Sequence, residues 1–298
     1  MTLFILPSLQ VLVGETAASA ITVMIFLFGN LSEILFAFSI LLQYDVAVDR
    51  LQKLETSLKR PPPDEQALEA LRLKETGPFE KLTLSECTFS YHNAEGISSF
   101  QVGPFDLELS RGELVFIVGG NGSGKSTFLR MLCGLYLAEQ GTLRFNNIPI
   151  TAHNVELYRQ QFSTVFTDFH LFDQLYGLEH VTEAQVVALQ KQFMLDHKTF
   201  FDGHQFSTLD LSTGQRKRLA LLTALLEERP ILILDEVSAD QDPEFRRYYY
   251  EVLLPELRAQ GKTLLVVSHD DRYFHIADRV LYMNDGTFDL TRTLNPAH

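Results

Sequence analysis

The chain has 298 residues, 46% of them hydrophobic, and a formal net charge of −13 at pH 7, which allows a packed core in one large domain or two smaller ones. The negative charge argues against nucleic acid as a main partner, because neutralising phosphates requires clustered Lys and Arg. The two cysteines, Cys87 and Cys133, are too few for a disulfide framework or a structural zinc site. We predict that both are buried thiols of a reducing compartment.

The N-terminal part of the chain is strongly apolar. No charged residue occurs from Thr16 to Ser32, and after Glu33 the apolar run continues to Leu42. The run exceeds the roughly 20 residues that cross a bilayer. No basic segment precedes it, and it is too long for a cleaved signal peptide. We therefore predict a transmembrane helix at residues 16–42, with a buried helix of a soluble protein as the alternative.

The residues that flank this run predict its orientation. One acidic residue, Glu15, lies close before it, whereas four basic residues follow it: Arg50, Lys53, Lys59 and Arg60. Basic flanks favour the cytoplasmic side of a membrane, so the rest of the chain is predicted to be cytoplasmic. The apolar residues 3–13 correspond to about half of another span. This indicates the carboxy-terminal portion of a longer membrane protein, or a gene whose front is missing.

Three consecutive prolines at positions 61–63 end the helical pattern that follows the apolar run. We predict a transmembrane part at residues 1–58, a linker at 59–78 and a separate domain at 79–298. Early in this domain, an imperfectly alternating segment that ends at Tyr91 predicts an edge strand. Tyr91 precedes a glycine-rich loop in the sequence. Its ring is equally suited to stacking on adenine and to packing as an ordinary aromatic residue of a strand.

The glycine-rich loop VGGNGSGKST follows the apolar strand LVFIV. Its spacing, G-x-x-x-x-G-K-[ST], arises by chance at roughly the 1% level in a chain of this length, and an ordinary glycine-rich turn is the alternative. A strand, this loop and a following helix direct backbone N–H groups at one anion. Lys125 is predicted to contact the β- and γ-phosphates of a nucleoside triphosphate, and Ser126 to ligate Mg²⁺. The predicted nucleotide-binding residues of the loop are Gly119, Asn121, Gly122, Ser123, Gly124, Lys125, Ser126 and Thr127.

Two later apolar strands end in polar side chains. ILILDE predicts a central parallel strand, after which Asp235 can hold Mg²⁺ and Glu236 can orient and polarise an attacking water. TLLVVSHDD predicts a similar strand followed by His269, whose imidazole can hydrogen-bond the γ-phosphate. The alternatives are a surface acidic pair and a structural histidine. Because open α/β sheets bind ligands at the carboxyl ends of their strands, we predict that these side chains meet beside the glycine-rich loop.

The segment LSTGQ precedes a helix with an apolar face. The Ser212 hydroxyl and the N–H groups near Gly214 provide a second helix start that can bind an anion. One phosphate loop does not need a second such site on its own chain, whereas two chains docked head to tail would. We therefore predict that the nucleotide binds between two subunits, with Ser212, Thr213, Gly214 and Gln215 facing the partner's nucleotide.

These motifs, in this order, resemble those of the ATP-binding cassette (ABC) family over roughly residues 79–286. GGNGSGKST resembles its Walker A, LSTGQ its signature, with Thr213 where glycine is usual, ILILDE its Walker B, SADQD its D-loop and SHD its switch-histidine segment. The resemblance implies a P-loop α/β fold with a mixed sheet and a helical subdomain. It also implies ATP hydrolysis with Mg²⁺, a second ABC subunit as partner, and a place for Asp242 at the nucleotide site.

A narrower resemblance, carried by FSTVFTDFHLFDQL and ADQDPEFRR, is to cyclic-peptide and siderophore exporters of the syringomycin and pyoverdine types. It implies membrane lipid and an exported peptide or siderophore-like substrate as further partners. Thr167 or Asp168 stands where the family has a glutamine that contacts Mg²⁺, and we predict Asp168 as a metal ligand. The alternative function is a membrane-tethered cassette that binds nucleotide but transports nothing itself. A soluble DNA-repair or translation-type ABC protein is disfavoured by the apolar segment and the negative charge.

Overall fold

The computed structural model describes residues 78–92 and 98–289, together with residues 24, 26–28, 31, 33–38, 40, 44, 47–52, 54 and 55. The chain divides into two compact units, Met1–Pro61 and Pro62–His298. In the first unit the described residues are helical and exposed. No helix formed by the described residues is long and apolar enough to cross a bilayer. The predicted span 16–42 lies largely outside these residues, as do the half-span before it and nearly all of the predicted linker.

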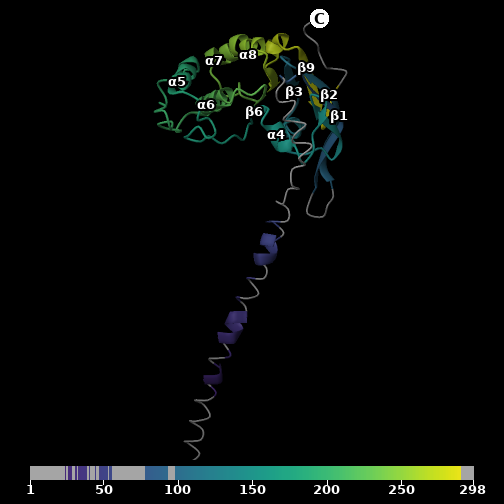
Figure 1. Ribbon diagram of the computed structural model, residues 1–298, viewed down its shortest axis with the longest axis vertical. Coiled ribbons are helices and arrows are strands. Elements are labelled where there is room, and N and C mark those ends of the chain that lie inside the picture. Colours follow the sequence, from purple (N-terminus) through teal and green to yellow (C-terminus); the bar gives the residue numbers. More distant parts are fainter. Residues whose placement is uncertain are drawn as a thin grey trace, which may run out of the picture. The chain divides into compact units, whose positions relative to one another are not determined.

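The second unit contains two β-sheets (Figure 1). The smaller sheet is antiparallel, with the strand order β2–β1–β4–β5. The strand predicted to end at Tyr91 is β1, and it pairs on both sides, so the prediction of an edge strand was wrong. Register shifts near Cys87 interrupt its alternation of buried and exposed side chains, which explains the edge-like pattern. The strands are β1 Lys81–His92, β2 Ser98–Ser110, β4 Gln140–Phe145 and β5 Ile148–Pro149.

The larger sheet has the order β10–β9–β3–β8–β7–β6, and all its pairs are parallel except β10 with β9. The predicted parallel strands are confirmed, and β7 and β8 are buried along their whole length. Because the strands are parallel, their carboxyl ends lie at one edge of the sheet. The strands are β3 Leu114–Val118, β6 Phe162–Val165, β7 Ile231–Asp235, β8 Thr263–Val267, β9 Arg279–Asn284 and β10 Thr287–Phe288.

Two hydrophobic cores lie on opposite faces of the larger sheet. Leu114 and Phe116 of β3 pack into one core, and the alternate residues Val115 and Ile117 pack into the other. This two-residue alternation explains why the strand reads as a continuous apolar run. The predicted burial of Cys87 and Cys133 is confirmed, and both are free thiols. Burial raises the pKa of Cys133 to about 11, so its thiol stays protonated at neutral pH.

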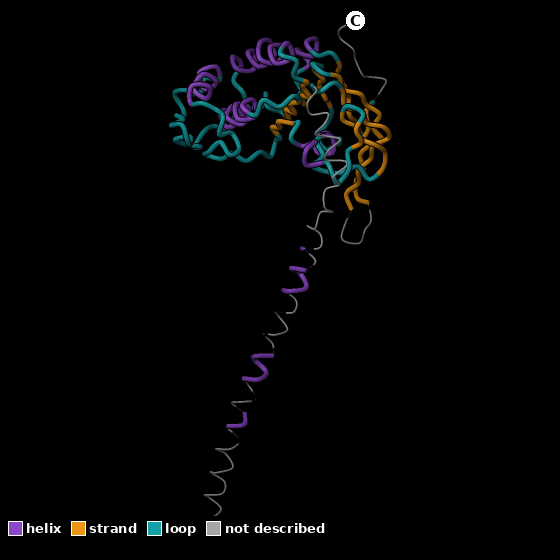
Figure 2. The backbone as a smooth tube through the Cα atoms, viewed as in Figure 1, coloured by secondary structure: helices purple, strands orange, loops and turns teal. Residues whose placement is uncertain are grey.

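Helices α5 to α8 gather on the side of this unit away from the antiparallel sheet (Figure 2). Helices α5 and α6 pack on each other and belong to the predicted helical subdomain. A π-helical turn, η1, joins α7 to α8, and a 3₁₀ turn, η2, follows β8. The bounds are α3 Lys125–Leu132, α4 Val155–Arg159, α5 Glu183–Gln192, α6 Thr213–Leu226, α7 Pro243–Tyr248, η1 Tyr249–Leu253, α8 Leu254–Ala259 and η2 Asp271–Ile276.

Candidate active site

The glycine-rich loop connects the end of β3 to the start of α3. Gly122 and Gly124 have φ angles of 77° and 104°, a region that side chains with a Cβ rarely adopt. A Cβ on Gly124, the N-cap residue of α3, would also lie 2.9 Å from Cγ1 of Val102. Glycine at this position therefore lets the antiparallel sheet pack against the loop while the N–H groups of the first helical turn remain available to an anion.

A cavity of about 340 Å³ lies over this loop. The Lys125 side chain is 7% exposed, and its ammonium donates hydrogen bonds of 2.8 Å to Gly119 O and 2.9 Å to Gly120 O. A positive charge and the start of α3, whose first N–H groups have no partner within the helix, thus lie at this cavity, as a bound polyphosphate requires. The cavity is lined by Phe100, Asn121, Gly122, Ser123, Gly124, Lys125, Ser126, Thr127 and Glu236.

The carboxyl end of β7 brings Asp235 to the first turn of α3. The Ser126 hydroxyl donates a hydrogen bond of 3.1 Å to Asp235 Oδ2. Burial raises the pKa of Asp235, against the lowering effect of hydrogen bonds from Ser126 and Thr167. A buried carboxylate beside a hydroxyl is an oxygen donor set that suits Mg²⁺, which usually takes few protein ligands. Among the residues described, no group of three His, Cys, Asp or Glu side chains is placed to hold a metal ion.

Replacing Asp235 by Asn is expected to raise the thermal midpoint of the nucleotide-free chain by a few degrees. A shift of that size corresponds to roughly 1 kcal/mol in the free energy of unfolding. A carboxyl whose pKa is raised by folding destabilises the folded state increasingly as pH rises through that pKa, and Asn removes this penalty. Thermal unfolding at pH 7.5 without nucleotide measures the effect, and the difference from wild type should shrink at acidic pH. A lower midpoint for the variant at both pH values would contradict the prediction.

Parallel pairing of β7 with β8 brings Glu236 and His269 together. The two strands are in register at Asp235 and Val267, and His269 Nε2 lies 3.2 Å from Glu236 Oε1. Glu236 has a φ of 54°, a left-handed conformation that costs a non-glycine residue roughly 1–3 kcal/mol and occurs often at functional sites. The Glu236 side chain borders the phosphate cavity and also a second cavity of about 300 Å³ that His269 lines.

Tyr91 lies at the amino-terminal end of α3. Its hydroxyl is 3.4 Å from Thr127 Oγ1 and 3.4 Å from the Tyr136 hydroxyl. Phe89 stacks on Tyr136, with ring centroids 4.6 Å apart, and Tyr91 meets both rings edge-on. Phe89 and Tyr136 are not among the residues predicted from the sequence, although Phe89 shares the face of β1 with Tyr91. Together the three rings form an aromatic surface next to the phosphate loop.

Asp168 and Thr167 occupy different positions in the loop after β6. The Asp168 carboxylate accepts a hydrogen bond of 2.7 Å from Arg130, and its side chain is 71% exposed. The hydrogen bond to Asp235 comes from Thr167. In this arrangement Thr167 is joined to the predicted cation ligands, whereas Asp168 is engaged by Arg130 on α3.

The predicted signature residues form the start of α6. Ser212 is the N-cap, and its hydroxyl accepts a hydrogen bond from the N–H of Gln215, whose side chain accepts one from the Ser212 N–H. Ser212 and Thr213 are exposed, and neither is a lining residue of the phosphate cavity on their own chain. The start of α6 thus presents polar groups to solvent, separate from the loop that would hold the phosphates of the same chain.

Two basic residues of α6, Lys217 and Arg218, fix the D-loop to the signature segment. Lys217 Nζ donates to Glu236 O at 3.0 Å and to the Asp240 carboxylate at 3.1 Å. Arg218 pairs with Asp242, which also caps α7. Both basic side chains are buried, and neither is among the residues predicted from the sequence. The available signal was their helical spacing, four residues before Leu221 and Leu222 of the apolar part of α6, since a buried charge needs a partner.

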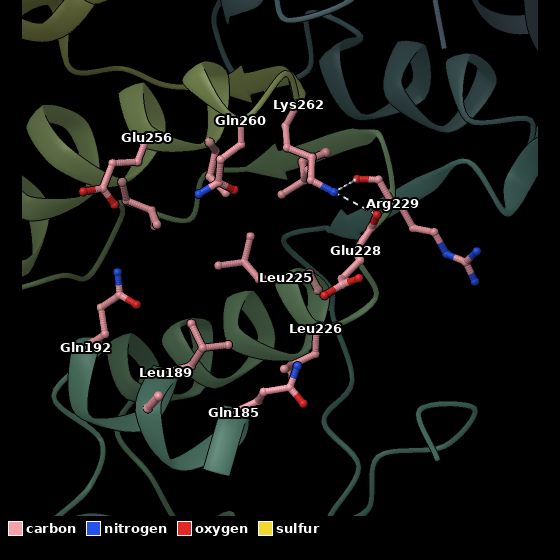
Figure 3. A pocket seen from close by; sticks show the side chains of 15 residues that line it. Gln185, Leu189, Gln192, Leu225, Leu226, Glu228, Arg229, Glu256, Gln260 and Lys262 are labelled. Carbon is pink, nitrogen blue, oxygen red and sulfur yellow. Dashed lines mark hydrogen bonds between the residues drawn. The ribbon is translucent and has the colours of Figure 1, made fainter. Parts of the chain in front are cut away.

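A separate groove of about 440 Å³ lies between α5, the end of α6 and α8 (Figure 3). Lys262 Nζ donates hydrogen bonds of 2.8 Å to Glu228 O and to Arg229 O just beyond the end of α6, a favourable place for a cation because helix carboxyl ends carry unpaired carbonyls. None of the predicted nucleotide-site residues lines this groove, so we assign it no part in ATP binding.

Comparison with known proteins agrees with this arrangement. Residues 102–239 match the family described as ABC transporter. The ATP-binding protein SyrD of Pseudomonas syringae pv. syringae is 39% identical over 95% of this chain and 51% of its own length, so the chain spans about half of that relative. The probable amino-acid import ATP-binding protein YxeO of Bacillus subtilis (strain 168) is 32% identical over 61% of this chain and 78% of its own length.

A solved structure shows the same fold in a nucleotide-bound state. The dimeric ATP-binding cassette MJ0796, in a post-hydrolysis state with ADP and Pi, aligns with a TM-score of 0.61 and 26% identity, over 72% of this chain and 98% of that one. The alignment agrees with the P-loop α/β fold with a mixed sheet described above. The chain therefore belongs to the ABC transporter family and contains its ATP-binding and ATP-hydrolysing cassette.

Proposed function

We propose that the chain is the ATP-hydrolysing subunit of an ABC exporter that drives a cyclic peptide, a siderophore or a related compound across the bacterial inner membrane. The observation that carries the catalytic part is the placement of Lys125, Ser126, Asp235 and Glu236 around the phosphate loop, with His269 against Glu236. The export part rests on the motif resemblance and on the similarity to SyrD, which extends over 95% of the chain.

Each side chain has a role that its geometry suits. Lys125 and the N–H groups of the loop bind the phosphates, and Ser126 with Asp235 would hold Mg²⁺. When bound, Mg²⁺ neutralises charge on the β- and γ-phosphates. Glu236 accepts a proton from the attacking water and orients it. His269, hydrogen-bonded to Glu236, contacts the γ-phosphate.

The remaining predicted residues extend this proposal beyond the phosphate loop. The aromatic surface that includes Tyr91 is the place where adenine stacks. Asp168 would have to leave Arg130 to reach the cation. Asp242 shapes the D-loop through its pairing with Arg218.

The exposed start of α6 supports a dimer with ATP between the subunits. Ser212 and Thr213 at this helix start are exposed on their own chain, where their hydroxyl groups can reach a phosphate of a second subunit. The MJ0796 cassette is a dimer in its solved structure. We propose the same head-to-tail pairing for this chain, with residues 212–215 completing the partner's nucleotide site.

The membrane part of the proposal rests on the first unit. Its described residues are helical and expose apolar side chains, among them Met24, Phe28 and Phe36. Such a surface on a helix is unfavourable in water and suits lipid or other membrane helices. We propose the division that the sequence predicts, with residues 1–58 in a membrane domain, 59–78 as linker and 79–298 as the ABC domain.

Reconstitution into liposomes tests the export function. ATPase activity should rise when a cyclic peptide or siderophore of the exporting cell is added, and that compound should accumulate on the side opposite the ATP. A chain that hydrolyses ATP without such stimulation would favour a tethered cassette with a binding or regulatory role. Purification without detergent would count against the membrane domain.

Replacing His269 by Ala is expected to lower kcat for ATP by about 10- to 100-fold, within the range of a positioned polar group in a transition state. The KM for ATP should change little, because the phosphate loop is untouched. Steady-state ATPase kinetics check this result, and His275→Ala on η2 is the control. An equal loss of ATP affinity would contradict a role limited to the transition state.

A further inference from the structure

Two buried serines and a tyrosine connect the loops that contain Glu236 and His269. Ser238 lies two residues after Glu236, and Ser268 directly precedes His269. The Tyr250 hydroxyl is 2.7 Å from Ser238 Oγ and 2.6 Å from Ser268 Oγ. All three side chains are buried. One buried hydroxyl group therefore joins the two loops.

The position of Tyr250 is fixed by its own surroundings. It lies in the π-helical turn η1, a type of turn found frequently at functional sites. Its ring stacks on Tyr273 of η2, with centroids 4.2 Å apart and planes 12° apart. Burial raises the pKa of Tyr250, so the hydroxyl keeps its proton at neutral pH. That single proton is donated to one serine, and the other serine donates in return.

The two loops need such a connection because the sheet ends before them. The pairing of β7 with β8 ends at Asp235 and Val267. Glu236 follows at once, in a left-handed conformation that persists only where surrounding contacts hold it. Lys217 holds the carbonyl of Glu236 from the side of α6. Tyr250 contacts both loops at once, so it can fix one relative to the other.

We propose that Tyr250 is a positioning residue for ATP hydrolysis, which sets the Glu236 carboxylate relative to the His269 imidazole by joining Ser238 to Ser268. The proposal rests on the roles given above to Glu236 and His269. Tyr250 lines neither the phosphate cavity nor the second cavity beside Glu236. It therefore acts through the two loops and makes no contact with nucleotide.

Two neighbouring tyrosines provide a matched test in the full chain. Tyr250→Phe removes only the bridging hydroxyl. Tyr249→Phe removes the hydroxyl of an equally buried tyrosine that has no hydrogen-bond partner among the described residues. We expect Tyr250→Phe to lower kcat for ATP about tenfold, since small displacements of catalytic groups are costly. Its KM for ATP and its thermal midpoint should stay close to those of the wild type, and Tyr249→Phe should match wild type throughout.

Several results would overturn the positioning role. Wild-type kcat in Tyr250→Phe would do so, and so would an equal fall of kcat in Tyr249→Phe. A loss of ATPase activity in Tyr250→Phe that comes from a higher KM, with kcat unchanged, would also overturn it. If Tyr250→Phe does not fold, Ser268→Ala takes its place and should lower kcat with KM unchanged; wild-type kcat there overturns the proposal. Full ATPase activity in Glu236→Gln would contradict the proposed function, and the positioning role of Tyr250 would fall with it. If Glu236→Gln is inactive and Tyr250→Phe is fully active, only the positioning role is overturned.

Discussion

Replacing Glu236 by Gln is expected to give a chain that binds ATP but hydrolyses it at least about 100-fold more slowly, because an amide cannot accept the proton of the attacking water. The change keeps the size of the side chain and an oxygen that can face His269. Lys125 and the loop N–H groups are untouched, so ATP binding should persist. ATP that is bound and not hydrolysed should hold two chains together, since each nucleotide would contact both subunits.

Size-exclusion chromatography with ATP and Mg²⁺ measures this second effect. The Glu236→Gln variant should elute as a dimer with ATP and as a monomer without nucleotide, whereas wild type should return to the monomer as ATP is consumed. Glu256→Gln is the matched control, because Glu256 is exposed on α8 and lines only the groove away from the phosphate loop. A monomer under every condition would count against ATP bound between subunits.

Replacing Lys125 by Ala should reduce ATP hydrolysis at least about 100-fold, as expected when a charge that stabilises the transferring phosphoryl group is lost. It should also weaken ATP binding, in contrast to Glu236→Gln. The physical reason is that the Lys125 ammonium lies in the wall of the phosphate cavity, where low exposure strengthens its attraction to phosphate. In the nucleotide-free chain this ammonium is satisfied by the carbonyls of Gly119 and Gly120.

Titration with a fluorescent ATP analogue, together with steady-state ATPase assays, separates the two effects of Lys125→Ala. Lys191→Ala is the control, since Lys191 is an exposed lysine of α5. Thermal unfolding should show that Lys125→Ala remains folded, because the side chain makes its hydrogen bonds only to two loop carbonyls. A wild-type rate of ATP turnover in Lys125→Ala would contradict the proposal that the loop is an ATP site.

The phosphate loop could be predicted from the sequence because its conformation is local. A strand, the glycines at positions 122 and 124 and the following helix are adjacent along the chain, and the positive φ angles that the loop needs are available to glycine alone without strain. The strands β7 and β8 were predictable for a similar reason. Their residues alternate between two cores, so each of the two appears in the sequence as an apolar run that is followed by a polar side chain.

Contacts between distant segments decided the rest. The ion pair between Arg130 on α3 and the Asp168 carboxylate, which bears on the prediction of Asp168 as a metal ligand, is one such contact. The buried charges of Lys217 and Arg218 have their partners in the D-loop, more than twenty residues further along the chain. Sequence spacing does not reveal such pairs, because they form only when the loops after β7 and the start of α6 pack together.

The sequence by itself determined which residues can bind phosphate, a cation and water, since those properties belong to the side chains and to their immediate neighbours. It did not show that β1 lies inside its sheet, because register shifts near Cys87 disguise its pattern. It also gave no sign that Tyr250 bridges the loops after β7 and β8. Only the tertiary structure decided these points, because hydrogen bonds between strands and between buried hydroxyl groups join residues that are far apart along the chain.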